Sequence, residues 1–225
     1  MNNMKPLSRR LETFRDRYPL IGPAFWIASI QFFIINLVVA LAWPPHYSFL
    51  NNTISDLGNT VCGDYGGRYV CSPDHILMNI SFIVLGATMI AGSALIYHEF
   101  RTSWPSALGF SFMAIGGLGT LLVGIFPENT ISGLHVLGAT LPFLIGNLSM
   151  IILGLNLKMP QSLRVYSIVS GAVALVAALL FVTNHYLGLG TGGMERLAAN
   201  LQTVWLIVFG LYISKNHFAK NTQQA

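Results

Sequence analysis

Acidic side chains and a histidine lie next to the apolar segments of this chain, and together these residue types can do chemistry. Asp56 lies in the long polar loop, Glu128 follows the third apolar segment, and His135 is near the start of the fourth. A carboxylate and an imidazole can bind a metal ion or polarise a water molecule as a general base. The sequence has no HExxH or GxSxG motif. The three residues are therefore catalytic candidates only, no cofactor is predicted, and a divalent metal stays an open alternative.

Three further residues extend this candidate site. Ser55, beside Asp56, is a candidate nucleophile, although a loop serine in this position more often forms a turn or cap. Glu195 and Arg196 open the sixth apolar segment, where they either form structural ion pairs, with Asp56 or Glu128 as alternative partners of the arginine, or contact a substrate. The guanidinium fork of arginine suits phosphate. The predicted substrate-binding set is Ser55, Asp56, Glu128, His135, Glu195 and Arg196.

The elements that carry these residues are built for a lipid bilayer. Of 225 residues, 53% are hydrophobic and only 9% are charged, against roughly 25% charged in soluble domains. Runs of about 20 apolar residues cross a hydrocarbon core about 30 Å thick. The sequence therefore predicts an all-α, polytopic membrane protein with six transmembrane helices in one bundle, at residues 21–43, 76–97, 107–125, 134–157, 165–183 and 195–214.

The basic residues predict the orientation of the bundle. Ten of the twelve Lys and Arg residues fall on one side of a six-helix path, and only Arg68 and Arg196 fall on the other. The positive-inside rule then places both termini in the cytoplasm. We expect a cytoplasmic N-terminal segment (1–20), a transmembrane domain (21–214) with an extracytoplasmic loop (44–75), and a cytoplasmic tail (215–225). The basic residues are scattered, so the net charge of +4 does not indicate a nucleic-acid partner.

The extracytoplasmic loop contains both cysteines, Cys62 and Cys71. An oxidising compartment permits a disulfide there, and closing so short a loop would stabilise the fold by roughly 2–3 kcal/mol. We therefore favour a bridge over two free thiols, and the spacing of the two cysteines is not that of a zinc site. Glycines such as Gly86 and Gly117, inside the second and third segments, predict close helix packing.

Several short strings resemble a known family. They are ISDLG at 54–58, GIFPE at 124–128, His135 followed by Gly138 and Ala139, and GMERL at 193–197. In this order and spacing they resemble the prokaryotic membrane family of domain of unknown function 998, which is related to the six-helix Frag/DRAM/Sfk proteins. The resemblance implies the fold, the topology and the signature residues. It also implies a multi-pass protein of a prokaryotic inner or plasma membrane.

Three functions follow as hypotheses. The first is recognition of a membrane lipid head group by the outer polar residues, because the resembling proteins are associated with lipid organisation and remodelling. The second is an intramembrane lipid hydrolase or acyltransferase that uses the same residues. The third is a small-solute transporter, for which the polar candidates near the midplane are Gln31, Asn36, Asn147 and Gln202. The sequence leaves the oligomeric state open.

Overall fold

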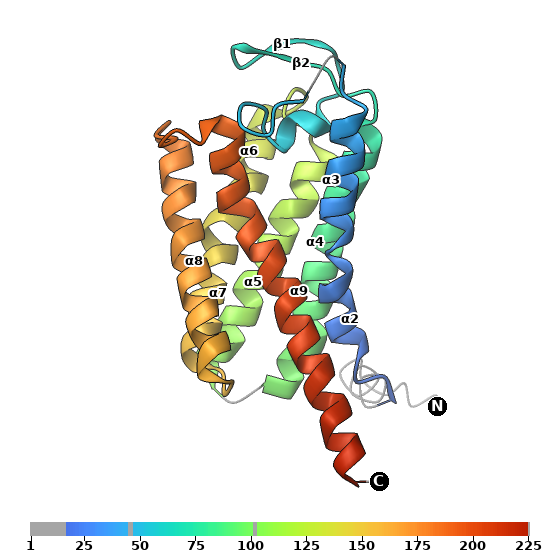
Figure 1. Cartoon of the computed structure of the whole chain (residues 1–225), viewed down its shortest axis with the longest axis vertical. Helices are drawn as coiled ribbons and strands as arrows, with labels where there is room; N and C mark the ends of the chain where they lie inside the picture. The colour runs from blue at the N-terminus through green and yellow to red at the C-terminus, as the bar shows by residue number, and fades with distance from the viewer. Residues whose placement is uncertain (1–16, 45–46, 101–102, 225) are drawn as a thin grey trace, which may run out of the picture.

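The computed structural model describes residues 17–44, 47–100 and 103–224, with side chains described as far as residue 219. Most of the predicted N-terminal segment, together with Arg101, therefore lies outside the described residues. Six helical segments are long and apolar enough to cross a membrane: Ile21–Leu41, His75–Phe100, Trp104–Ile125, Ser132–Asn156, Gln161–Val182 and Gly190–Ala219. They run side by side in one bundle, and the described ends of the chain lie at the same end of it (Figure 1). The predicted all-α, six-helix membrane architecture is confirmed.

The first and fourth segments are interrupted. The first consists of α2 (Ile21–Ala28) and α3 (Gln31–Leu41), and Gln31 exchanges two hydrogen bonds with Ser81 of α4 (His75–Tyr97) beside the break. The fourth consists of α6 (Ser132–Thr140), the π-helical segment η3 (Leu141–Gly146) and α7 (Asn147–Asn156). Pro142 lacks an N–H and cannot continue the α-helical ladder, which accounts for the change of helix type.

The remaining spans are continuous helices. The short segment η2 (His98–Phe100) extends α4, and α5 (Trp104–Ile125) and α8 (Gln161–Val182) end close to their predicted limits. The last helix, α9 (Gly190–Gln224), begins five residues before the predicted span and is helical through most of the predicted tail. Hydropathy had identified only its most apolar part.

Glycines bring α4 and α5 into close contact, as predicted. A Cβ atom on Gly86 would lie 2.5 Å from the carbonyl oxygen of Gly117, which is closer than such atoms can approach. Small side chains at a membrane helix interface allow this backbone approach. The two helices run side by side through the bundle, and the upper end of α4 lies next to the loop structure that carries the polar residues (Figure 1).

The long loop is folded over one end of the bundle. It contains the 3-10 segment η1 (Ser55–Gly58) and a hairpin of β1 (Gly63–Tyr65) and β2 (Arg68–Val70). Figure 1 places the hairpin at the end of the bundle opposite the two chain ends. Because six crossings bring both chain ends to one end of the bundle, the long loop lies at the other end. This is the end where the sequence predicted the polar site.

Candidate functional site

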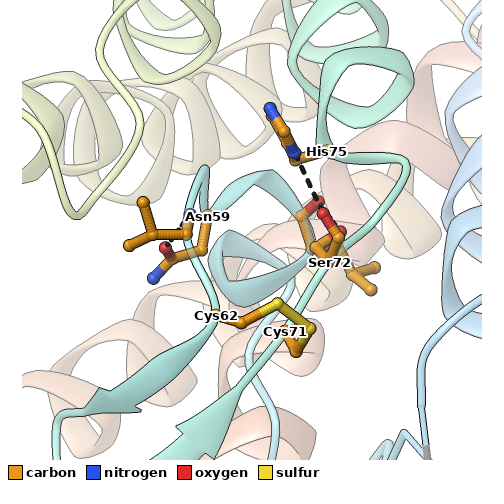
Figure 2. The surroundings of a disulfide bond; sticks show 7 residues. Asn59, Cys62, Cys71, Ser72 and His75 are labelled. Carbon is orange, nitrogen blue, oxygen red and sulfur yellow. Dashed lines mark hydrogen bonds between the residues drawn. A yellow bond between two sulfur atoms is a disulfide. The ribbon is translucent and has the colours of Figure 1, made fainter.

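The hairpin is held in shape from both ends. Gly66 and Gly67, with φ of +58° and +77°, form its two-residue turn, and such positive angles are what a type I′ hairpin requires. At the open end, Cys62 and Cys71 form the predicted disulfide immediately outside the paired strands. Figure 2 shows this bridge beside Ser72 and His75, where the chain enters α4. The hairpin is therefore fixed relative to the helix bundle.

The hairpin delivers Arg68 to Asp56. The Nε atom of Arg68 lies 2.6 Å from Oδ2 of Asp56, and its Nη2 atom pairs with Oδ1. The Asp56 side chain is fully buried and also accepts hydrogen bonds from the Asn52 amide and the Thr53 backbone N–H. Burial by itself raises the pKa of Asp56, but the hydrogen bonds from Arg68 and Glu128 outweigh it and lower the pKa overall. Asp56 is therefore a carboxylate.

Glu128 forms a carboxyl pair with Asp56. Burial, the hydrogen bond to Asp56 and the negative charge of Asp56 together raise the pKa of Glu128 to about 9. A neutral carboxyl group can donate its proton to a neighbouring carboxylate, whereas two neighbouring carboxylates repel each other. The Asn59 amide contacts Oε1 of Glu128 at 3.4 Å, and the Tyr65 hydroxyl donates to the Glu128 backbone carbonyl. The raised pKa favours a neutral Glu128 carboxyl group at neutral pH.

Ser55 of η1 and His135 of α6 face each other. The Nε2 atom of His135 lies 3.0 Å from the Ser55 hydroxyl oxygen, and its Nδ1 atom lies 2.9 Å from the backbone carbonyl of Phe126. A carbonyl oxygen can only accept, so Nδ1 carries a proton. In the neutral imidazole the lone pair of Nε2 then points at Ser55. The helix α6 and the chain turn after α5 fix this orientation.

Glu195 approaches Ser55 from the first turns of α9. Its Oε1 atom lies 3.1 Å from the Ser55 hydroxyl, and its Oε2 atom accepts the backbone N–H of Ile54. The side chain is buried. Ser55 thus lies between an imidazole and a carboxyl group that come from two different membrane segments.

A cavity of about 470 Å³ adjoins these groups. Its polar wall contains Ser55, Arg68, Glu128, His135 and Glu195, and its apolar walls come from α6, η3 and α8. The predicted site residues Ser55, Glu128, His135 and Glu195 are therefore brought together around one space. Asp56 lies behind this wall, where it holds Arg68 and Glu128.

Arg196 is placed elsewhere. Its Nη1 atom donates to the backbone carbonyls of Phe49, Asn52 and Gly192, and its Nη2 atom donates to the Tyr47 hydroxyl. Its guanidinium group also lies over the rings of Tyr47 and Phe49. Arg196 does not line the cavity, and these contacts tie the loop to the start of α9. The cation at the cavity is Arg68, which sequence reasoning missed as a site residue although it was one of the two basic residues on the outer side.

Asn147 and Gln202, two of the polar residues that the sequence placed near the midplane, each contact a neighbouring helical segment. The Asn147 amide donates to the carbonyls of Phe143 and Ala198, and the Gln202 amide lies 3.4 Å from the Pro142 carbonyl. These bonds serve backbone groups around the π-helical segment. Within the described residues there is no cluster of three or more His, Cys, Asp or Glu side chains arranged to hold a metal ion.

Comparison with known proteins gives one family. The model of a family described as "Protein of unknown function (DUF998)" matches residues 26–212, from within the first membrane segment to within the sixth. No curated protein and no solved structure gives a significant match.

Proposed function

This chain belongs to the DUF998 family of proteins of unknown function, and we propose from its cavity that it binds a membrane phospholipid, with the head group at the polar wall. The observation that carries the proposal is the division of the cavity. Hydrogen-bonding side chains line one part, and apolar side chains from two membrane segments line the rest. A molecule with a polar head and apolar tails complements such a space.

The apolar walls support entry from the bilayer. Val136 of α6, Leu144 of η3 and Val182 of α8 line the cavity and are also exposed on the outside of the bundle. In a membrane span, an exposed apolar side chain faces lipid tails. A bound phospholipid would keep its tails between α6–η3 and α8 while its head reaches the loop end of the bundle.

The polar wall supports a phosphate-containing head group beside Arg68. Two donor nitrogens of Arg68 are engaged by Asp56, whereas Nη1 has only a long contact of 3.4 Å to the Gly66 carbonyl. Arginine binds phosphate through such N–H groups. The sequence had assigned this role to Arg196, whose nitrogens bond to the loop, so the proposal moves to Arg68. Because Asp56 compensates the charge of Arg68, we expect hydrogen bonding to contribute more than net charge.

The orientation proposed from the basic residues agrees with this assignment. It puts the cavity in the outer leaflet of a cell membrane, where a disulfide such as Cys62–Cys71 is stable. The resemblance of the ISDLG and His135 strings to the Frag/DRAM/Sfk proteins, which are associated with lipid organisation, also supports a lipid ligand. A prokaryotic inner or plasma membrane remains part of the proposal.

The test is native mass spectrometry of the protein purified in mild detergent. We expect wild type to retain phospholipid and the Thr140→Trp variant to lose it, because Thr140 lines the cavity and its side chain is exposed. Leu148→Trp is the matched control, since Leu148 is an exposed residue of the same span that does not line the cavity. Arg68→Gln should retain less phospholipid than wild type. Equal phospholipid on wild type and Thr140→Trp would contradict the proposal.

A further inference from the structure

We propose that the cavity cleaves an ester bond of its bound lipid, with Ser55 as the nucleophile and His135 as the general base. This inference rests on the proposed function, because the bound phospholipid supplies the ester. Its starting point is that Ser55 is half-buried and lines the cavity together with His135. A nucleophilic hydroxyl needs a base within hydrogen-bond reach and a space for the reacting carbonyl.

The histidine is oriented to accept a proton. The Phe126 carbonyl holds the Nδ1 proton at 2.9 Å, which leaves Nε2 as the acceptor 3.0 Å from the Ser55 oxygen. In serine hydrolases a carboxylate usually fixes this tautomer. Here a backbone carbonyl at the end of α5 does so, and it holds the ring in a single orientation within a buried setting.

Proton counting at Ser55 supports the same assignment. The hydroxyl has one hydrogen but two neighbours that can accept it, Nε2 of His135 and Oε1 of Glu195 at 3.1 Å. A Glu195 carboxylate accepts the Ser55 hydrogen. If Glu195 is neutral, both contacts are satisfied when Glu195 donates to Ser55 and Ser55 donates to His135. In this state the serine hydrogen already points at the base. Glu195 acts as a positioning residue, because its other oxygen is fixed by the Ile54 N–H.

The surroundings place an ester carbonyl beside Ser55. A second, smaller pocket of about 50 Å³ shares Ser55 and Glu195 with the main cavity, and its other walls are almost entirely apolar, including Phe32, Phe82 and Met89. The smaller pocket is too small for an acyl chain, so the acyl chains lie along the apolar walls of the main cavity and the head group lies at its Arg68 side. The ester link between them then lies at Ser55. The Nη1 group of Arg68, on the cavity wall, can donate a hydrogen bond to the carbonyl oxygen on which negative charge develops.

The reaction balances with water as the second substrate. Ser55 Oγ bonds to the ester carbonyl carbon while its proton passes to Nε2 of His135. The bond from that carbon to the alcohol oxygen then breaks, and the leaving alcohol takes the proton from Nε2. Water adds to the acyl-serine and gives a proton to Nε2. Ser55 leaves with that proton, and the products are a free fatty acid and the deacylated lipid.

The test uses a fluorophosphonate with an alkyl chain, which reacts with activated serine hydroxyls, on the full chain in phosphatidylcholine nanodiscs. We expect one adduct on wild type, mapped to Ser55 by peptide mass spectrometry, and none at this position in Ser55→Ala. His135→Gln keeps the serine and should slow labelling by roughly 100-fold or more. Ser162→Ala, an exposed serine at the start of α8, should label as wild type does. Diacyl phosphatidylcholine should release fatty acid, whereas the dialkyl ether analogue should not.

The outcomes separate this inference from the proposed function. Retained phospholipid with no Ser55 adduct and no fatty acid release overturns ester cleavage and leaves lipid binding standing. Labelling that is equally fast in wild type and His135→Gln overturns the role of the histidine. If Ser55 is labelled in a protein that retains no phospholipid, the proposed phospholipid binding is contradicted. Thermal unfolding of each variant shows whether a loss of labelling comes from a loss of fold.

Discussion

Two of the three guanidinium nitrogens of Arg68 donate to the two carboxylate oxygens of Asp56, with 2.6 Å between Nε and Oδ2. The two residues are twelve positions apart, and the hairpin between them sets their geometry. This bidentate pair is the link between the loop and the cavity, because Arg68 lines the cavity while Asp56 is fully buried behind it.

Removing Arg68 should therefore destabilise the protein. In Arg68→Gln the Asp56 carboxylate stays buried without its cation, and we expect a loss of about 2–3 kcal/mol in the free energy of unfolding, less than for a fully buried pair because Arg68 is partly exposed. The stability of Arg68→Lys should lie between those of wild type and Arg68→Gln, since lysine keeps the charge but lacks the guanidinium fork. Thermal unfolding in detergent measures this, with the exposed Arg164→Gln as control. An equal loss of stability in Arg68→Gln and in the control Arg164→Gln would contradict the pairing.

The raised pKa of Glu128 predicts a pH dependence of stability. With a pKa of about 9 in the folded state against 4.5 for the ordinary group, the folded chain keeps a proton that the unfolded chain releases as the pH rises. The contribution is therefore complete below about pH 4.5 and is lost between there and pH 9, with a slope of at most about 1.4 kcal/mol per pH unit. Glu128→Gln should flatten the curve and be more stable than wild type at pH 8. An unchanged slope in this variant would show that Glu128 is ionised.

The disulfide should act through the hairpin. Opening it in the Cys62→Ser/Cys71→Ser variant should cost roughly 2–3 kcal/mol for a loop of this length, and it should release Arg68 from Asp56. Hydrogen exchange of residues 63–70 should become faster, while exchange in α4 and α5 stays slow. Fast exchange across the whole bundle would instead show that the bridge supports the complete fold.

The contact between α4 and α5 predicts a steric effect. Gly86→Ala would put a Cβ atom 2.5 Å from the Gly117 carbonyl oxygen, and we expect a loss of about 1–3 kcal/mol from overpacking. Gly133→Ala in α6 is the matched control, because no atom lies within 4 Å of its Cβ position. It should leave stability unchanged or raise it slightly. Thermal unfolding of the two variants side by side decides between crowding and a general effect of alanine.

Hydropathy predicted the membrane segments because each crossing has to be an apolar helix that satisfies its own backbone. It could not predict that α9 begins at Gly190, since the first turn of that helix is held by tertiary contacts. The backbone N–H groups of Gly192 and Gly193 both donate to the Leu50 carbonyl. The π-helical turn was also missed, although Pro142 carried a signal, because a proline inside a helix interrupts the α-helical hydrogen bonding.

Of the six candidate residues the structure brings four around one cavity, and sequence reasoning missed both Arg68 and its pairing with Asp56. Topology brought Ser55, Glu128, His135 and Glu195 to one end of the bundle, and the structure places them around one cavity. The partner of Asp56 depends on a hairpin whose position follows from a disulfide and a glycine turn, so Arg196 was considered where Arg68 is found. Arg68 still carried a signal, because it is one of only two basic residues on the side that the positive-inside rule predicts to be outside.

The proton assigned to Glu195 gives a last prediction. A glutamine at this position reproduces the neutral acid, since its carbonyl oxygen can accept the Ile54 N–H and its amide can donate to Ser55. Glu195→Gln should therefore unfold within about 1 kcal/mol of wild type, whereas Glu195→Ala leaves the buried Ile54 N–H without this partner and should lose about 1–3 kcal/mol. The fluorophosphonate labelling rate is the second readout: it should be preserved in Glu195→Gln and reduced in Glu195→Ala, whose serine is no longer positioned. Loss of stability and of labelling in the glutamine variant would mean that Glu195 is a carboxylate and that the serine hydrogen points at it rather than at His135.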